Sequence, residues 1–283
     1  MKTASDRFRS SLRVPVTRYS LPWFLKLHRL SPGTIVVLGG AAAILIGTIL
    51  LLLPWATPSS YYKPLSIIDA LFTATSAVCV TGLIVADTAK DFTVFGQTIV
   101  LILIQIGGLG YATLVTMLLL TIGRQIGLRD RLMMAEALSS LNLQGLIPFI
   151  KTIVLWTFML ELLGAMFLSI RFLQDYPIGQ AFYHGAFQAI SAFNNAGFSS
   201  FSTNLIAYQT DLTVNLIVPI LIILGGLGFI VLLDVAQIFR GERHRLQAHS
   251  KLVLVMTAFL IVGGALSLLL LEWNNPKTWE IYR

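Results

Sequence analysis

The chain has 283 residues, of which 56% are hydrophobic and only 12% are charged. A soluble globular domain carries roughly 25% charged residues, so this composition excludes a soluble enzyme and a disordered chain. Lys and Arg outnumber Asp and Glu by 20 to 13, and the single cysteine, Cys79, excludes a disulfide framework and a cysteine metal cluster. We therefore expect an all-α membrane protein in contact with the lipid bilayer.

Five stretches are apolar and long enough to cross a membrane as helices, which takes about 20 mostly apolar residues. In chain order they lie within residues 31–62, 92–123, 152–170, 212–233 and 252–271. The third contains a charged residue, Glu161, and the other four contain none. These five stretches are the predicted membrane spans.

Two further stretches, 67–86 and 176–210, could be spans or loops that enter the membrane and return. Lys and Arg help to decide, because cytoplasmic segments of membrane proteins carry an excess of them. Three basic clusters, within residues 2–29, 124–131 and 240–251, hold 14 of the 20 basic residues. Successive clusters lie on the same side of the membrane only if the chain crosses it an even number of times between them. All three clusters therefore lie in the cytoplasm only if both stretches are re-entrant. The sequence thus predicts a multi-pass protein of the cell membrane with a cytoplasmic N-terminus, and the net charge of +7 reflects topology rather than a nucleic-acid partner.

The two re-entrant stretches belong to an internal repeat, a common feature of transporters. Residues 76–83 match residues 191–198 at an offset of 115, and residues 104–111 match residues 222–229 at an offset of 118. Each unit is expected to contain a span, a short pore helix, a glycine-bearing filter loop and a second span. The expected organisation is a basic cytoplasmic N-terminus at 1–30, a first unit at 31–122, a cytoplasmic linker at 123–145, a second unit at 146–239, a cytoplasmic linker at 240–251 and the first span of an incomplete third unit at 252–283.

The repeated loops have the chemistry of a cation path. The short helices expected near 66–75 and 182–190 would carry the partial negative charge of their C-terminal ends into the membrane. Carbonyls of the loops that follow can replace the hydration shell of a cation, and neither loop contains Lys or Arg. Gly82 and Gly197 give the loops a backbone freedom that other residues lack. We therefore predict units arranged around a pore axis, as in potassium channels.

At these residues the sequence resembles the Trk/Ktr/HKT superfamily of cation channels and transporters. Within it, the sequence is most similar to the membrane subunit of bacterial Ktr-type potassium uptake systems. The resemblance extends from about residue 31 to the end of the chain. It is carried by two Gly-Gly-Leu-Gly motifs and by Cys79-Val80-Thr81-Gly82-Leu83, Phe95-Gly96-Gln97-Thr98 and Ser191-Ala192-Phe193-Asn194-Asn195-Ala196-Gly197-Phe198-Ser199.

The resemblance implies four span–loop–span units around a potassium-selective filter, with Gly82 and Gly197 as the first two filter glycines. Relatives with serine at the first of these positions prefer sodium, so Gly82 implies potassium permeation. The sequence ends before a third or fourth loop, which makes the chain look truncated. The resemblance further implies a homodimer of membrane subunits on a cytosolic ring of nucleotide-binding regulatory subunits. It also implies sodium as a stimulating ion and no organic cofactor in this chain.

The predicted potassium-binding residues lie in the two filter loops. The first rank comprises Val80, Thr81, Gly82, Asn195, Ala196 and Gly197, and the second rank comprises Cys79 and Asn194. Cys79 is expected to pack beside the filter and to contribute at most its carbonyl. No metal ion other than potassium is expected as a ligand of this chain.

Several residues outside the loops have two interpretations. An ionisable residue at mid-membrane is a functional candidate by default, and Glu161 is such a residue. Its carboxylate could contact the ion, or it could hold the filter scaffold by accepting hydrogen bonds from the pore-loop backbone. We favour the scaffold role. The glycines of the Gly-Gly-Leu-Gly motifs are explained by close helix approach, with a hinge as the alternative. His184 is expected to be hydrogen-bonded within the protein, and Asp234 to lie at a helix end or in a regulatory contact.

Three functional hypotheses compete at this point. The leading one is potassium uptake across the membrane through a carbonyl-lined selectivity filter. The second is a truncated fragment of such a transporter that does not conduct. The third, an intramembrane enzyme, is rejected because the sequence contains no Ser/His/Asp set, no His-Glu-x-x-His motif and no paired carboxylates in its apolar stretches.

Overall fold

A computed structural model describes residues 32–58, 65–110, 146–239, 241 and 245–275. Every regular element within these residues is a helix, which confirms the predicted fold class. The elements are α2 (Pro32–Leu51), α3 (Ile67–Val78), α4 (Val94–Leu109), α7 (Leu146–Phe172), α8 (Ile178–Phe193), η2 (Ile206–Tyr208), α9 (Leu212–Gly226), α10 (Phe229–Phe239) and α11 (Ala248–Glu272). The predicted N-terminus at 1–30 and the linker at 123–145 lie outside the described residues.

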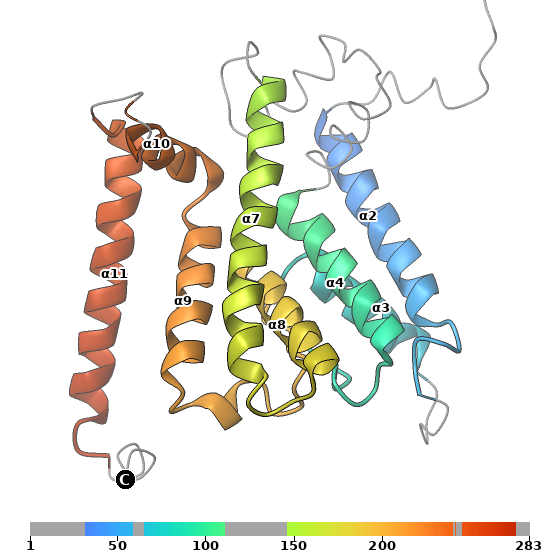
Figure 1. The fold of residues 1–283 in the computed structure, drawn as a ribbon. Helices are drawn as coiled ribbons and strands as arrows, with labels where there is room; N and C mark the ends of the chain where they lie inside the picture. The colour runs from blue at the N-terminus through green and yellow to red at the C-terminus, as the bar shows by residue number, and fades with distance from the viewer. Residues whose placement is uncertain (1–31, 59–64, 111–145, 240, 242–244, 276–283) are drawn as a thin grey trace, which may run out of the picture.

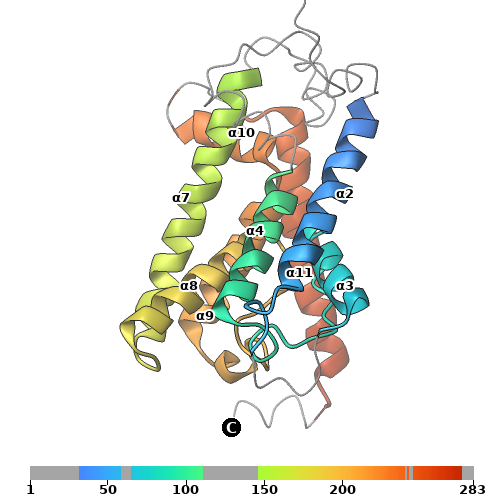
Figure 2. The same ribbon diagram turned by 90° about the vertical axis from the view of Figure 1, so that its right-hand side faces the viewer.

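The helices form two similar groups that meet in the middle of the molecule. In the first group α3 packs against α2 and α4, and in the second α8 packs against α7 and α9. The long helices run side by side, the short helices α3 and α8 lie toward one end, and α10 crosses the opposite end (Figures 1 and 2). The apolar core of the first group also contains Phe187, Ala196 and Phe198 from the second group, so each group completes the packing of the other.

The helices α3 and α8 are too short to cross a bilayer. At 1.5 Å per residue, their 12 and 16 residues extend about 18 and 24 Å, whereas the hydrocarbon core is about 30 Å thick. The helix α8 contains the whole predicted range 182–190, and α3 contains the predicted range 66–75 except Ser66, which is its N-cap. Ser66 caps the start of α3, where its hydroxyl accepts a hydrogen bond from the Asp69 amide at 3.1 Å. These lengths fit segments that enter the membrane and return.

Two of the five predicted spans are continuous helices long and apolar enough to cross a membrane, over Ile150–Phe172 and Ala248–Glu272. The predicted span at 212–233 is a broken one in the structure, because α9 and α10 are bent by 104° relative to each other. At the bend Gly228 has φ of +84°, a left-handed conformation that ends helices. The chain therefore turns at the Gly-Gly-Leu-Gly motif and continues as α10, which runs across the end of the bundle.

The remaining two predicted spans are shorter in the described residues. Apolar helices cover Val37–Leu51 and Val94–Leu109. The second ends where Gly110 adopts φ of +74°, at the position that corresponds to Gly228 in the repeat. Residues 111–123 of that predicted span lie outside the described residues. The corresponding helices α4 and α9 therefore both end just before the last glycine of the repeated motif.

The helices α4 and α9 also begin in the same way. The Thr93 hydroxyl accepts a hydrogen bond from the Gly96 amide at 3.3 Å, and the Asp211 carboxylate accepts one from the Val214 amide at 3.0 Å. These N-caps satisfy amides that have no partner inside the helix. The two caps are separated by the same offset as the glycine motifs, so the repeat extends from the start to the end of these helices.

Asp234 connects α10 with α11. Its side chain is only 2% exposed and accepts a hydrogen bond from the backbone amide of Gln247, the N-cap of α11, at 2.8 Å. A carboxylate at a helix N-terminus is favoured by the helix dipole. Asp234 thus lies in the middle of α10 rather than at its end, and the helix end that it contacts is the start of α11.

Arg171 joins the end of α7 to the start of α9. Its guanidinium donates to the Asp211 carboxylate and, at 2.8 Å, to Asp175, and it lies 5.4 Å from the ring centroid of Tyr208. Burial by itself would raise the pKa of Asp211, but hydrogen bonds from the Val214 amide and from Arg171 hold that pKa below its ordinary value. The ionised carboxylate is therefore the form that stabilises this end of the bundle.

We expect Asp211→Asn to lower the free energy of unfolding by roughly 1–3 kcal/mol, because asparagine can still cap α9 but cannot pair with Arg171 as an anion. A depressed folded-state pKa contributes stability above the unfolded-state value of about 3.9, and this contribution is lost as the pH falls through the folded-state pKa. Thermal unfolding of the detergent-solubilised protein should therefore show a steeper acid-side loss of stability in the wild type than in the variant.

Asp175→Asn provides the matched control. Asp175 contacts the same guanidinium, but its side chain is 42% exposed, and exposed ion pairs contribute about 1 kcal/mol or less. Equal losses of stability in the two variants, or identical acid-side slopes in the wild type and Asp211→Asn, would contradict the role assigned to Asp211.

Candidate functional site

The loops that follow α3 and α8 have the same backbone conformation. The φ angles are +54° at Val80 and +74° at Gly82 in the first loop, and +57° at Asn195 and +74° at Gly197 in the second. A β-branched residue such as valine rarely adopts a positive φ, and such a conformation persists only where the surrounding structure imposes it. The agreement at positions 115 residues apart shows that the sequence repeat is also a conformational repeat.

A serine hydroxyl holds the far end of each loop. Ser76 Oγ donates to the Leu83 carbonyl at 2.7 Å, and Ser191 Oγ donates to the Phe198 carbonyl at 2.5 Å. Both serines are buried in the pore helices. Sequence reasoning did not identify them as functional residues, although their match at the offset of 115 was a signal that could have found them.

The backbone of the same serines holds the middle of each loop. The Thr81 amide donates to the Ser76 carbonyl at 2.9 Å, and the Ala196 amide donates to the Ser191 carbonyl at 2.8 Å. In the first loop the Thr81 hydroxyl also donates to Ser76 Oγ at 3.1 Å. Each loop is therefore fixed to the last turn of its own helix at two successive points.

Between these anchors the carbonyl oxygens of the loops have no hydrogen-bond partner among the described residues. This holds for all six first-rank residues, which are Val80, Thr81, Gly82, Asn195, Ala196 and Gly197. Thr81, Asn195 and Gly197 are exposed and Val80 and Gly82 are half-buried, so their carbonyls are open to water or to a cation, and rings of free carbonyls coordinate cations in channel filters. The arrangement can thus offer oxygen ligands to a dehydrated cation.

The two loops meet at their glycines. A Cβ atom placed on Gly82 would lie 2.7 Å from the carbonyl oxygen of Ala196 and 3.1 Å from the Cα atom of Gly197. A Cβ atom placed on Gly197 would lie 3.2 Å from the Cα atom of Gly82. The fold therefore brings the predicted filter residues of both halves together, and neither glycine can carry a side chain without moving the opposite loop.

The first glycine of each Gly-Gly-Leu-Gly motif makes room for the end of a pore helix. A side chain on Gly107 would collide with the carbonyl of Val78, the last residue of α3. A side chain on Gly225 would collide with the carbonyl of Phe193, the last residue of α8. Close approach is therefore the role of these glycines, but their partner is the end of a short helix rather than another span.

The last glycine of each motif has a different role. Gly110 and Gly228 both have positive φ, and a Cβ atom on either would meet no atom within 4 Å. They end α4 and the straight part of the second unit, where the chain bends. This is a turn rather than a site of helix contact.

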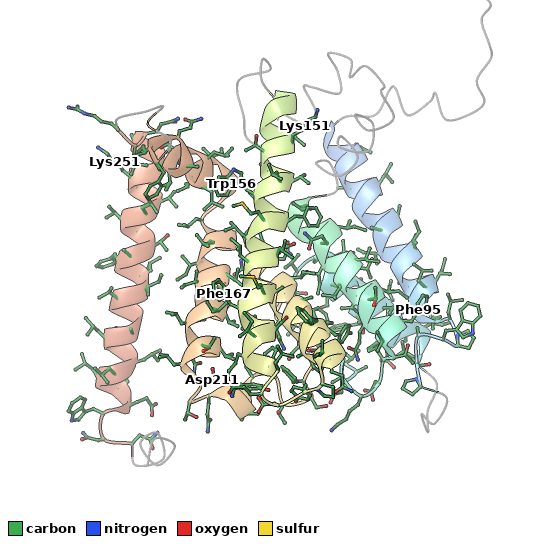
Figure 3. All side chains as sticks on the ribbon, in the orientation of Figure 1. Phe95, Lys151, Trp156, Phe167, Asp211 and Lys251 are labelled. Atoms are coloured by element: carbon green, nitrogen blue, oxygen red, sulfur yellow. The ribbon has the colours of Figure 1, made fainter. Side chains whose placement is uncertain are left out.

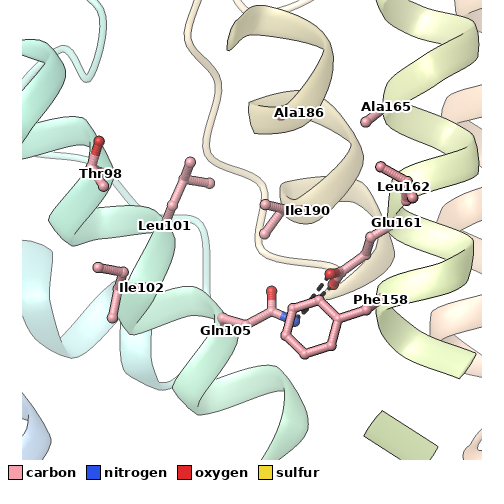
Figure 4. Close-up of a pocket in the computed structure, with 10 residues that line it drawn as sticks. All are labelled: Thr98, Leu101, Ile102, Gln105, Phe158, Glu161, Leu162, Ala165, Ala186 and Ile190. Atoms are coloured by element: carbon pink, nitrogen blue, oxygen red, sulfur yellow. Dashed lines mark hydrogen bonds between the residues drawn. The ribbon is translucent and has the colours of Figure 1, made fainter. Parts of the chain in front are cut away.

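Glu161 lies at the centre of a buried polar network that joins the two halves. Its carboxylate is 4% exposed and accepts hydrogen bonds from Gln105 Nε2 at 3.0 and 3.1 Å and from Asn194 Nδ2 at 2.9 Å. Asn194 Nδ2 also contacts Gln105 Oε1 at 3.1 Å. Figure 4 shows the bond between Gln105 on α4 and Glu161 on α7. The donors to Glu161 are side chains, so the expectation of donors from the loop backbone is wrong.

Gln105 is a further residue that sequence reasoning missed. It is one of two amides in the apolar helix α4, the other being Gln97, and an unpaired amide there would be costly. That cost was the available signal that Gln105 has a polar partner. The partner itself could not be deduced, because Glu161 lies 56 residues away in the other half.

The two second-rank positions differ in their surroundings. Asn194 ends α8 and is held by Glu161 and Gln105. Cys79 occupies the same position after α3, but its side chain is exposed. The expectation that Cys79 packs beside the filter stays a prediction, and among the described residues no counterpart of the Glu161 network holds this position.

The second loop borders a cavity of about 250 Å³ lined by Gln188, Ser191, Asn195 and Gly197, among others. Nearby, the His184 ring lies 2.8 Å (Nδ1) from Ser200 Oγ and stacks on Phe201, with the ring centroids 4.6 Å apart. The histidine is therefore hydrogen-bonded within the protein, as expected, and holds the chain that follows the second loop.

We expect Glu161→Gln to lower the free energy of unfolding by roughly 1–3 kcal/mol, because two amide donors would then face a neutral amide in place of a carboxylate. The ratio of potassium to sodium transport should stay close to that of the wild type, since Glu161 contacts the second loop through Asn194 and does not itself lie among the loop carbonyls. Thermal unfolding and the ratio of potassium to sodium transport measure the two effects separately.

The exchange variant Glu161→Gln/Gln105→Glu is the control. It keeps one carboxylate and one amide facing each other and leaves Asn194 within reach of both, so most of the lost stability should return. A selectivity change in Glu161→Gln with unaltered unfolding, or no recovery in the exchange variant, would argue against a scaffold role.

The chain is similar to three bacterial uptake proteins. It is 44% identical over 254 residues to Ktr system potassium uptake protein B of Bacillus subtilis, covering 90% of this chain and 56% of that protein. It is 39% identical over 244 residues to the protein of the same name from Vibrio alginolyticus, covering 86% and 53% of the two chains. It is 37% identical over 247 residues to the potassium/sodium uptake protein NtpJ of Enterococcus hirae, covering 87% and 54%.

The chain thus spans about half the length of the curated relatives that it matches. Residues 36–274 match the TrkH family, which is described as cation transport proteins. This match includes both repeated loops, the Glu161 network and both glycine motifs, and a family of transport proteins agrees with the expectation that the chain is not an enzyme. The chain is a multi-pass membrane protein that belongs to the TrkH family of cation transport proteins.

Proposed function

We propose that the two loops line part of a path for potassium ions across the membrane. The ligands are the carbonyl oxygens of Val80, Thr81, Gly82, Asn195, Ala196 and Gly197, with Cys79 and Asn194 in a secondary position. One observation carries the proposal: two loops with matching positive φ angles, whose carbonyls have no partner among the described residues, pack against each other at Gly82 and Gly197. The C-terminal ends of α3 and α8 add partial negative charge beside them.

Potassium is the proposed ion for two reasons. The printed names of the relatives include potassium uptake in all three cases, and the residue at the first filter position is Gly82 rather than the serine associated with sodium preference in this superfamily. Sodium is proposed as a second cation, a proposal supported by the name of the Enterococcus hirae relative. No organic cofactor is proposed for this chain.

The proposed topology places the N-terminus in the cytoplasm, with span–loop–span units at 31–122 and 146–239. Lys151 on α7 and Lys251 on α11 lie toward one end of the molecule, and Asp211 lies at the opposite end (Figure 3). Basic residues favour the cytoplasmic side, so the end with Lys151 and Lys251 faces the cytoplasm. The loops then enter from the external side.

The proposed partners are a second copy of the membrane subunit and a cytosolic ring of nucleotide-binding regulatory subunits. Two of the relatives are named as components of a Ktr system, which supports an assembly of several subunits. Cytoplasmic segments rich in Lys and Arg within 2–29, 124–131 and 240–251 provide the proposed contact surface for such a ring.

A second candidate is a part of such a transporter that does not conduct by itself. It is favoured by the length of the chain relative to its relatives and by the presence of two loops where the superfamily has four. The decisive experiment measures potassium uptake by cells that lack their own uptake systems. It compares the 283-residue chain with the same chain extended by the C-terminal half of the Bacillus subtilis relative.

If only the extended chain takes up potassium, the 283-residue form is a part of a transporter that does not conduct by itself. If both forms take up potassium, the two loops are sufficient for conduction. Membrane insertion is measured for each form, so that failure to insert is distinguished from failure to conduct. Full insertion of the extended chain without potassium uptake would overturn the proposed function.

In whichever form transports potassium, Gly82→Ala should reduce uptake at least about tenfold. The left-handed backbone costs a non-glycine residue roughly 1–2 kcal/mol, and the added Cβ atom would press against Ala196 in the opposite loop. Gly241→Ala is the matched control, because Gly241 has the same φ of +74° but no atom within 4 Å of the added Cβ. Similar uptake by both variants would show that contact between the loops is not required.

A further inference from the structure

A cavity of about 490 Å³ separates α4 from α7 along the line where the two halves meet. Its walls come from α4 and α7 and its floor from α8 (Figure 4). The apolar lining residues include Leu101, Ile102, Phe158, Leu162, Ala186 and Ile190. We call this cavity the inter-repeat groove.

The polar side chains that line the inter-repeat groove are already paired inside the protein. The Thr98 hydroxyl donates to the Val94 carbonyl at 2.7 Å, so it is bonded to its own helix. Gln105 and Glu161 bond to each other and to Asn194. A polar ligand would therefore find little to bind, and the surface that remains available is hydrocarbon.

The inter-repeat groove opens to the outside of the bundle. Three of its apolar side chains are largely exposed: Ile102 at 54%, Phe158 at 52% and Leu162 at 71%. They belong to α4 and to the membrane-length helix α7, so they lie at the depth of the bilayer. Apolar side chains exposed at that depth contact lipid, and an apolar groove between them is filled by whatever fits from the bilayer.

We propose that one acyl chain of a bilayer lipid occupies the inter-repeat groove, with its methyl end toward Gln105 and Glu161. The proposal rests on the membrane location of the chain and does not depend on which ion it transports. From Thr98 to Gln105 the groove follows α4 for about 10 Å, or about a third of the hydrocarbon core. Over that length a helix of a partner protein would make only about two turns of contact, whereas a hydrocarbon chain from the bilayer can follow the whole groove.

Small side chains create this space. Ala165 on α7 and Ala186 on α8 line the inter-repeat groove, where larger residues would fill it. The acyl chain would rest against Ile190 in the last turn of α8, the helix that carries the second loop, and would keep water from the Glu161 network. Lipid packing at this position would thus support the loop from behind without contacting the ion.

The test uses the full chain in phosphatidylcholine vesicles that contain a phosphatidylcholine with a photoreactive diazirine near the end of one acyl chain. After illumination, mass spectrometry locates the lipid adducts. We expect adducts on groove residues such as Leu101 and Ile190, which lie behind the exposed rim. In Ala165→Trp, whose indole fills the groove, these adducts should be lost, while adducts on the exposed face of α11 remain.

Leu268→Trp is the matched control, because Leu268 is 64% exposed on α11 and the same indole there leaves the groove open. If thermal unfolding shows that the tryptophan variant is not folded, Ala165→Leu serves as a second variant that fills the groove with a smaller side chain. The proposal would be overturned if the wild type carried no adducts on Leu101 and Ile190. It would also be overturned if these adducts persisted in a folded variant whose groove is filled. Neither outcome depends on potassium uptake, so a failed lipid site is distinguishable from a failed ion path.

Discussion

The hydrogen bonds from Ser76 and Ser191 to the far ends of their loops are the interactions on which the candidate site depends. Irregular backbone at membrane depth has no water to satisfy it, so it must be held by protein or line a polar cavity. Each serine hydroxyl satisfies one loop carbonyl and fixes the direction of the chain, and the carbonyls between the anchors are left without a partner from any described residue. The positive φ values at Val80 and Asn195 are imposed by this fixation.

The two halves are then held in register by contacts that cross between them. Gly82 and Gly197 bring the loops together, Glu161 collects donors from α4 and from the end of α8, and the Tyr183 hydroxyl donates to Gln97 at 2.5 Å. A buried carboxylate is costly unless all its partners are present, so the Glu161 network favours a single arrangement of α4, α7 and α8. The lipid-filled groove that we propose lies along the same junction.

The pore helices, the glycine loops and their repetition could be predicted because the signals lie in the sequence itself: Lys and Arg mark the cytoplasmic segments, and the motifs recur at fixed offsets. The bend of 104° after α9 could not be predicted, since the hydropathy of an apolar stretch is the same whether the helix is straight or broken at Gly228. The difference between Cys79, which is exposed, and the matching Asn194, which is bonded to Glu161, could not be predicted either, because Glu161 lies in another segment of the chain.

The sequence by itself determined the helical class, the membrane location, the repeat and the residues of the two loops, because hydropathy and local motifs act within one segment of chain. Only the tertiary structure decided which distant groups meet: the partners of Glu161, the carbonyls opposite Gly107 and Gly225, and the groove between α4 and α7. These contacts join residues that are tens of positions apart. Their geometry is set by how the helices pack, and periodicity along the chain carries no record of it.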